Sequence, residues 1–222
     1  MKARFFLLKQ PWAWALVVFL IAGVAFIALW ARPTARPRQG AGEERALEGL
    51  GTFGKVPEFS LVERSGRKIR LADLAGRVWI ADFIYTLCTD TCPVQTAEMK
   101  TLQDKFAGER DLRFVSITVD PKRDTPAALG RYASRFGADS TRWLFLTGEE
   151  KAIYRLAQEG FHLAAGEIPT PKRDGSGATH LHSPRFVLVD RRGEIRGYYV
   201  GTDKDALARL WRDAGILLHS ER

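Results

Sequence analysis

Cys88 and Cys92 are the two cysteines of the chain, and they lie four residues apart in the segment FIYTLCTDTCPVQ, residues 83–95. Such a pair can form a structural disulfide, act as a redox-active dithiol, or supply two thiolates to a metal. A structural disulfide is disfavoured, because a bridge that closes so short a loop removes little chain entropy and a domain of this size buries a core without one. In a helical segment, residues four apart share one face, so both sulfurs could converge on one soft metal ion.

A third metal ligand would have to come from one of the four histidines. His180 and His182 stand in THLHSPRF, directly before a predicted strand, whereas His162 and His219 are expected on the surface. Two thiolates and an imidazole suit Cu(I) in a trigonal site, and Cu(II) with a fourth donor. Zinc accepts the same ligands together with a water, but a structural zinc site would have four protein ligands. The Irving–Williams order favours copper over zinc at equal geometry.

Two aspartates are candidates for assisting the sulfurs. Asp82 lies inside the apolar segment RVWIADFIY, residues 77–85, six positions before Cys88. If this carboxyl group is buried, its pKa rises and it can act as a base for a thiol; otherwise it points into a hydrated gap. Asp120 ends the segment LRFVSITVD, residues 112–120. It either forms a hydrogen bond with the site or caps the turn that follows, and we expect the turn.

The elements that would position these residues alternate between strands and helices. A hairpin turning at Ser65 and Gly66 is followed by predicted strands at 77–85, 112–120 and 142–148, each leading into a helix, at 93–106, 127–137 and 149–160. A second hairpin, 185–200, and a helix at 203–217 complete the pattern, which indicates an α/β fold with a mixed central sheet. The cysteines would then lie between a central strand and a helix N-terminus, where the partial positive charge favours thiolate.

The composition describes a globular protein, with 45% hydrophobic and 27% charged residues in a chain of 222. The formal net charge is +8. Basic residues of the predicted domain alternate with acidic ones in runs such as ERDLR and DPKRD. No segment combines clustered basic residues with interleaved aromatic residues, so we expect no nucleic-acid partner.

The N-terminal part contains an uncharged apolar run, PWAWALVVFLIAGVAFIALWA, at residues 11–31. As a helix the run spans about 30 Å, the thickness of a bilayer core. A cleaved signal peptide is disfavoured, because the run is long and lacks a suitable small-x-small cleavage site. We therefore predict a flank at 1–10, a transmembrane anchor at 11–31, a linker at 32–50 rich in Pro, Gly, Ala and charge, and a folded domain at 51–222.

Four features together resemble the SCO/SenC family of membrane-anchored copper proteins, over residues 56–217. They are DFIYTLCTDTCP, FVSITVDPKRDTPAAL, LHSPRFVLVDRRGEIRGYY and the N-terminal anchor. The resemblance implies a thioredoxin-like fold and one copper ion, Cu(I) or Cu(II), held by Cys88, Cys92 and His182. His182 matches the family histidine because it precedes Ser183 and lies eleven residues before the hairpin glycine, which leaves His180 as a residue near the site or on the surface.

The same resemblance implies a function in assembling the binuclear copper centre of cytochrome c oxidase subunit II. The chain would receive copper from an upstream donor protein and deliver it to the cysteines of the subunit, or would reduce those cysteines. The implied location is the inner membrane, crossed once, with the domain facing the periplasm. Two other functions stay open: a membrane-tethered thiol–disulfide oxidoreductase, in which His182 only tunes the thiolates, and a redox or copper sensor.

Three positions bear on these alternatives. Thr89 stands where the family usually has proline, and Leu181 stands where an acidic residue usually precedes the histidine, which can alter the orientation of the imidazole. Pro184 takes the place of the cis-proline that faces the cysteines in thioredoxin-like proteins. We therefore expect a cis peptide bond between Ser183 and Pro184.

Overall fold

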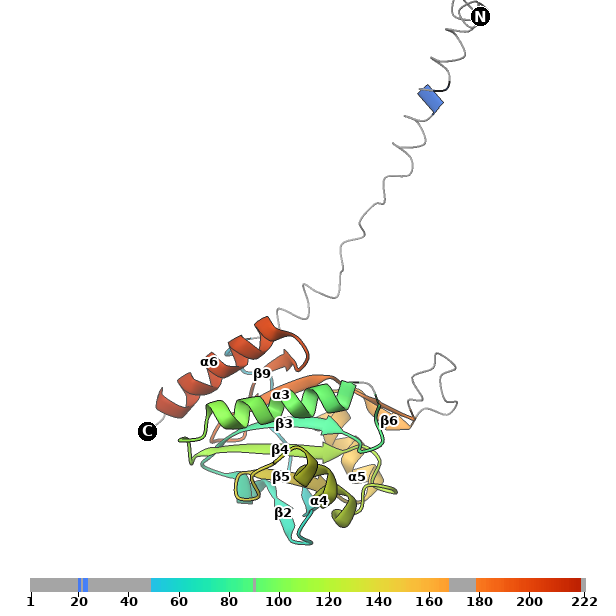
Figure 1. Cartoon of the computed structure of the whole chain (residues 1–222). Coiled ribbons are helices and arrows are strands. Elements are labelled where there is room, and N and C mark those ends of the chain that lie inside the picture. The colour runs from blue at the N-terminus through green and yellow to red at the C-terminus, as the bar shows by residue number, and fades with distance from the viewer. Residues whose placement is uncertain (1–19, 21, 24–48, 90, 168–178, 221–222) are drawn as a thin grey trace, which may run out of the picture. The chain divides into compact units, whose positions relative to one another are not determined.

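The structure is a computed structural model that describes residues 20, 22–23, 49–89, 91–167 and 179–220 (Figure 1). The chain divides into two units, Met1–Gly42 and Glu43–Arg222, and the fold below belongs to the second. Its centre is a seven-stranded sheet with the order β2-β1-β5-β4-β3-β8-β9. The strands are β1 (Ser60–Glu63), β2 (Lys68–Arg70), β3 (Val78–Ile84), β4 (Leu112–Thr118), β5 (Trp143–Thr147), β8 (Arg185–Val189) and β9 (Ile195–Val200).

The sheet is mixed, because β3, β4 and β5 pair in parallel while the strands at both edges pair antiparallel. A separate two-stranded sheet joins β6 (Ala165–Glu167) to β7 (His180–His182). The predicted α/β fold with a mixed central sheet is therefore confirmed. Both predicted hairpins are present as well, and their turns contain Gly66 at φ +87° and Gly193 at φ +78°, a conformation that favours glycine.

Three helices cover one face of the sheet: α3 (Thr91–Lys105), α4 (Pro126–Arg135) and α6 (Lys204–Ser220) (Figure 1). Helix α3 contacts α4 through Thr96 Oγ1 and Tyr132 Oη, 2.8 Å apart and both buried. It contacts α6 through Lys105, whose ammonium group lies 5.1 Å from the ring centre of Trp211. The helix that carries Cys92 is thus packed against a neighbour on each side.

The central strand β3 is buried at every position, as its almost continuously apolar sequence predicts. Trp79 and Phe83 point to one face, where both rings meet Phe161 edge-on. Phe161 follows α5 (Glu150–Arg155) and the π-helical turn η3 (Leu156–Gly160), which cover that face. Because side chains alternate along a strand, Asp82 points to the opposite face, which α3 covers.

All four predicted helices are present with ends that differ from the predicted bounds, and the differences at α3 and α5 bear on the site. Helix α3 begins at Thr91 rather than Pro93, so Cys92 belongs to its first turn. Proline is tolerated throughout a first helical turn, because the N–H groups there have no intrahelical partner, and it does not mark the first residue uniquely. The helix expected over 149–160 is α-helical only to Arg155 and then widens into the π-helical turn.

The predicted localisation at the inner membrane, with the domain in the periplasm, is contradicted by the structure. No helix in the described ranges is long and apolar enough to cross a membrane. A spanning helix needs about 20 consecutive apolar residues, whereas the longest described helix, α6, has 17 and carries charged residues along its exposed side. Of the predicted anchor at 11–31, only Leu20, Ala22 and Gly23 belong to the described residues, and the remainder lies outside them.

Candidate metal centre

Cys88 and Cys92 lie at the carboxyl end of β3, where the chain turns into α3. The N–H of Cys88 donates to the carbonyl of Tyr85, and the N–H of Cys92 donates to Sγ of Cys88 at 3.4 Å. Neither cysteine is in a disulfide and both are buried, with 8% of Cys88 and none of Cys92 exposed. The turn thus places the two sulfurs side by side without a disulfide.

The turn that carries Cys88 is fixed to the neighbouring strand by Asp124. This buried carboxylate accepts hydrogen bonds from the backbone N–H and the hydroxyl of Thr86 and from the hydroxyl of Thr118 in β4. The motif FVSITVDPKRDTP therefore supplies a brace for the cysteine loop. No short-range spacing pattern predicts this contact, since Thr86 and Asp124 are 38 positions apart.

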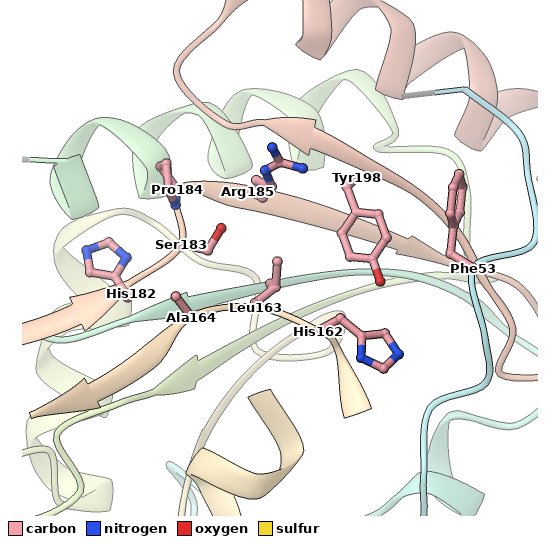
Figure 2. A pocket seen from close by; sticks show the side chains of 9 residues that line it. All are labelled: Phe53, His162, Leu163, Ala164, His182, Ser183, Pro184, Arg185 and Tyr198. Atoms are coloured by element: carbon pink, nitrogen blue, oxygen red, sulfur yellow. The ribbon is translucent and has the colours of Figure 1, made fainter. Parts of the chain in front are cut away.

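His182 is the last residue of β7 and stands at the start of the connection to β8 (Figure 2). Its partner in the two-stranded sheet is Ala165 of β6. The imidazole is partly buried, and its Nδ1 atom is buried without a hydrogen-bond partner. Tyr85 packs against the ring edge-on, with 5.6 Å between ring centres. These contacts hold the ring beside the cysteine turn.

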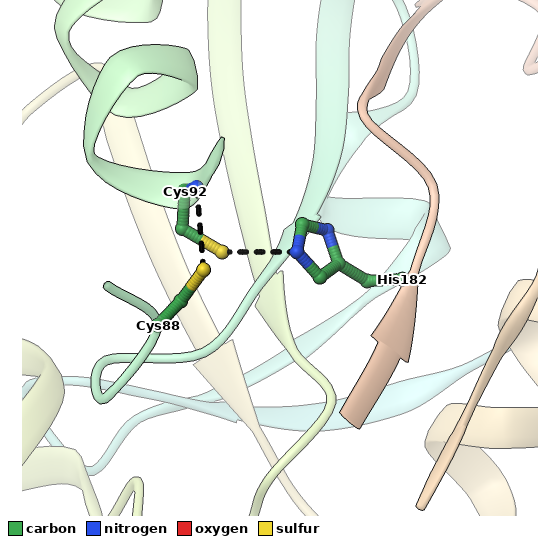
Figure 3. A group of neighbouring side chains, drawn as sticks. All are labelled: Cys88, Cys92 and His182. Carbon is green, nitrogen blue, oxygen red and sulfur yellow. Dashed lines mark hydrogen bonds between the residues drawn. The ribbon is translucent and has the colours of Figure 1, made fainter. Parts of the chain in front are cut away.

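The three side chains converge, as Figure 3 shows. Nε2 of His182 lies 3.3 Å from Sγ of Cys92, and the ligand atoms of Cys88, Cys92 and His182 all lie within 4.8 Å of one another. This is the one group of metal-ligating side chains with such geometry in the part of the chain that the structure describes. Two sulfurs and one imidazole nitrogen at this spacing can hold a soft metal ion.

The thiol of Cys92 holds its proton firmly when no metal is bound. The neighbouring Cys88 sulfur and burial raise the pKa of the Cys92 thiol above its usual range. This direction is opposite to the one expected from the helix N-terminus, because the loss of solvent and the second sulfur outweigh the helix dipole. A metal that binds here has to displace a proton.

Asp82 lies fully buried in β3, and both of its carboxylate oxygens lack a hydrogen-bond partner. Burial raises the pKa of Asp82 to about 7, while the nearby Ser116 hydroxyl and His182 ring counteract the rise. Its charge also acts on Cys92, whose pKa it raises further. Of the two environments considered from the sequence, the structure therefore has the buried one, on the side of the sheet that the metal-ligating group occupies.

His180 and Asp120 lie behind the three converging side chains. His180 is 7% exposed, its ring is tilted against Tyr85 at 5.4 Å between centres, and its Nε2 lies 3.9 Å from Oδ1 of Asp120. Asp120 also forms the expected turn, since its carbonyl accepts from the N–H groups of Arg123 and Asp124. Asp120 therefore contacts β7 as well as forming the turn, and His180 is a buried neighbour of the site.

Pro184 does not adopt the expected conformation. Every peptide bond in the described ranges is trans, including the one between Ser183 and Pro184. The trans form is the more stable one for a bond before proline, and here the carbonyl of Pro184 accepts the N–H of Gly201, the residue that follows β9. The side chain that faces the cysteines from this connection is His182 rather than the proline.

Tyr85 and Gln95 were missed by the sequence reasoning. Tyr85 is 3% exposed and lies between the rings of His180 and His182. Gln95 is fully buried in α3, three residues after Cys92, and neither its amide oxygen nor its amide nitrogen has a partner. The helical spacing from Cys92 could have indicated Gln95, whereas the position of Tyr85 depends on contacts between distant segments.

A thioredoxin-like α/β domain with two cysteines outside any disulfide and a histidine at one end of its central sheet defines a class of thiol-dependent redox and metal-binding proteins. The SCO1/SenC family model matches residues 50–210, and the chain belongs to this family. A SCO1 protein homolog from Bacillus subtilis is 33% identical over 150 residues, which are 67% of this chain and 75% of that protein.

Two solved structures of the family share the fold. BsSco is described as a member of the Sco family of cytochrome c oxidase assembly proteins with a disulfide switch. It is 29% identical to this chain with a TM-score of 0.65, and the match covers 78% of this chain and 98% of BsSco. Bradyrhizobium japonicum ScoI, solved with copper bound, is 27% identical with a TM-score of 0.56. The match covers 72% of this chain and 99% of ScoI.

Proposed function

We propose that this protein is a copper chaperone that binds one copper ion through Cys88, Cys92 and His182. The observation that carries the proposal is the convergence of the two sulfurs and Nε2 of His182 within 4.8 Å. Two thiolates and an imidazole suit Cu(I), and a fourth donor would adapt the site to Cu(II). The relative from Bradyrhizobium japonicum with copper bound supports copper over zinc.

The surroundings of the three side chains support transfer of the metal rather than permanent storage. Large hydrophobic residues are exposed beside each ligand: Leu87 before Cys88 at 61%, Val94 after Cys92 at 50%, and Leu181 before His182 at 51%. Exposed apolar side chains at such a rim favour contact with another protein. A docked partner can then replace the three ligands one at a time.

The partner that we propose is subunit II of cytochrome c oxidase, whose copper-site cysteines would receive the ion. An upstream donor protein would supply it. The proposal is supported by the relative BsSco, which is described as belonging to the cytochrome c oxidase assembly proteins. The cysteines of the recipient are soft ligands of the same kind as Cys88 and Cys92, so the ion can pass between them by thiolate exchange.

Proton transfer accompanies metal binding. Both thiols must lose a proton to act as ligands, and the proximity of Cys88 and burial oppose ionisation of Cys92. When Nε2 of His182 donates its lone pair to the metal, the ring proton has to reside on Nδ1. Oxidation of the two cysteines to a disulfide would abolish binding, which couples copper affinity to the redox state of the pair.

The test is a Cu(I) titration of the reduced, full-length protein beside its His182→Ala variant. We expect one copper per chain. Loss of the ligand itself should weaken copper binding at least as much as the ~10–100-fold that is typical when a residue hydrogen-bonded to a metal ligand is removed. His219→Ala is the matched control, because His219 lies exposed near the end of α6. Equal affinity of the wild type and His182→Ala would overturn the ligand assignment.

A second candidate function, thiol–disulfide exchange, is favoured by Asp82. A buried carboxyl group with a pKa of about 7 can accept the proton of a thiol near neutral pH. One thiolate would attack a disulfide of the partner and form a mixed disulfide. The second thiolate would then displace the partner's thiolate, which leaves a Cys88–Cys92 disulfide here and two reduced cysteines on the partner.

Kinetics with a model disulfide separates this function from copper delivery. Rapid reduction that is lost in Asp82→Asn but unchanged in His182→Ala would support the reductase. Strong copper binding that depends on His182, with slow reduction in all variants, would support the chaperone.

A further inference from the structure

A surface pocket of about 570 Å³ adjoins the proposed copper site, because His182 belongs to its lining (Figure 2). This volume lies within the usual range for ligand-binding pockets. It is lined by Phe53, His162, Leu163, Ala164, His182, Ser183, Pro184, Arg185 and Tyr198. Figure 2 shows His182 near one end and Tyr198 with Phe53 near the other, with Ser183, Ala164 and Leu163 between them. The elongated arrangement suits a short extended segment better than a compact small molecule.

A hydrogen-bonding group without a partner lies toward each end. Tyr198 in β9 is 5% exposed, and its hydroxyl is buried without a hydrogen-bond partner. Its ring packs edge-on against Phe53 at 5.6 Å between centres, and Figure 2 shows the hydroxyl pointing toward the side of the pocket where His162 lies. At the other end, Nδ1 of His182 is also buried and unpaired. Buried polar groups normally have partners, so two unpaired polar atoms at one pocket favour a ligand that pairs with them.

The charge of the lining selects the kind of occupant. None of the described residues that line the pocket is acidic, while Arg185 and two histidines contribute to it. A histidine that binds a metal almost always donates its second N–H to a carboxylate, a carbonyl or a water. Leu181, which precedes His182, cannot accept a hydrogen bond through its side chain. Among the described residues, none accepts the Nδ1–H of His182, and the positive charge of Arg185 in the lining favours a carboxylate as its partner.

We propose that this pocket receives an extended acidic segment of the protein that exchanges copper with this chain. A carboxylate of the segment accepts the Nδ1–H of His182, and an acceptor further along it receives the Tyr198 hydroxyl. Apolar side chains of the segment contact Phe53 and Leu163. The inference rests on the proposed function for the identity of the partner, but the pocket, the unpaired groups and the charge do not depend on copper.

The test uses two capped tripeptides as probes, acetyl-Leu-Glu-Leu-amide and its neutral match acetyl-Leu-Gln-Leu-amide. Each is titrated into the reduced, metal-free full-length protein with ¹⁵N-labelled histidine, and the ring nitrogen resonances of His182 are followed. We expect the acidic peptide to bind about tenfold more tightly and to shift the Nδ1 resonance, because a hydrogen bond to a charged group is stronger than one to a neutral group. Equal binding of the two peptides, or no shift at His182, overturns the proposal.

Two variants locate the binding in the pocket. Tyr198→Phe removes one donor and keeps the ring, so both peptides should lose affinity by about tenfold. Tyr199→Phe is the matched control, because the Tyr199 hydroxyl already donates to Asp213 of α6 and lines no part of the pocket. Peptide affinity unchanged by Tyr198→Phe contradicts the proposal. The protein carries no metal in this experiment. A failed copper titration would therefore contradict the proposed function alone, and a failed peptide titration would contradict the proposal for the pocket alone.

Discussion

Nε2 of His182 lies 3.3 Å from Sγ of Cys92, although 90 positions separate the two residues in the chain. The contact joins the first turn of α3 to the end of β7, which belongs to a different sheet from the one that α3 covers. Because Cys88 completes a group whose ligand atoms lie within 4.8 Å, a metal can bind with small side-chain adjustments. The proposed site is thus largely pre-formed without metal.

Copper affinity should rise steeply with pH. The Cys88 sulfur and burial raise the pKa of the Cys92 thiol, so at neutral pH binding has to displace its proton. Each displaced proton adds about one unit to the slope of log K against pH below the thiol pKa. We therefore expect a slope of about two between pH 6 and 8 when both thiols are protonated, measured by competition with a chelator whose own protonation is known. A slope near zero would mean that the pair is already ionised.

The strands that position the site were predictable from the sequence because their apolar patterns reflect the burial of each strand. β3 is apolar at nearly every position and is buried on both faces. The cysteines follow it directly, so their place at the end of a central strand followed from the order of elements alone. The family spacing selects His182 rather than His180, and in the structure it is the His182 ring that lies next to a sulfur, that of Cys92.

Contacts between distant segments were not predictable in the same way. The bonds of Asp124 to Thr86 and Thr118, and the approach of His180 to Asp120, depend on how three loops meet. A helix N-terminus can be predicted from a sequence, so the pKa of Cys92 was expected to fall. Burial beside a second sulfur cannot be predicted in this way, and it raises the pKa instead. The pocket beside His182 has no sequence signal, since Phe53, Leu163 and Tyr198 come from three separate segments.

Asp82 should make the reduced protein less stable as the pH rises from about 4 to 7. Burial raises the pKa of Asp82 in the folded state to about 7, against 3.8 for the ordinary carboxyl group. Below pH 3.8 the group is protonated in both states; between the two values only the unfolded chain releases the proton, which favours unfolding. A shift of this size corresponds to a few kcal/mol, since one unit is worth about 1.4 kcal/mol.

The measurement is urea unfolding from pH 4 to 8 of the wild type and Asp82→Asn. The variant cannot ionise, so its free energy of unfolding should lack the decline between pH 4 and 7. Asp104→Asn is the control, because Asp104 is exposed and paired with Lys100 on the surface of α3. The burial argument fails if the wild type and Asp82→Asn show the same pH dependence over this range.

Tyr199→Phe should destabilise the protein, whereas Tyr198→Phe should not. The Tyr198 hydroxyl is buried without a partner, so its removal relieves a desolvation cost and leaves the melting temperature unchanged or higher. The Tyr199 hydroxyl donates to the buried carboxylate of Asp213 at 2.8 Å. Its removal leaves that carboxylate with one partner fewer and should cost about 1–3 kcal/mol. Thermal unfolding of both variants checks the pair, and a larger loss in Tyr198→Phe would show that its hydroxyl has a partner in solution.

His180→Phe and His182→Phe should separate the role of a ligand from that of a neighbour. His180 packs on Tyr85 and approaches Asp120 at 3.9 Å, so a phenyl ring at this position keeps the aromatic contact and loses only the polar ones. Copper affinity in His180→Phe should fall by less than about tenfold. In His182→Phe a nitrogen ligand is removed, so copper affinity should fall by at least ~10–100-fold. Cu(I) competition titrations measure both affinities, and the spectrum of the Cu(II) form reports whether a nitrogen ligand is still present. The assignment is contradicted if the nitrogen ligand is lost in His180→Phe and kept in His182→Phe. His180 would then be the ligand, and the contact between His182 and Cys92 would belong only to the metal-free protein.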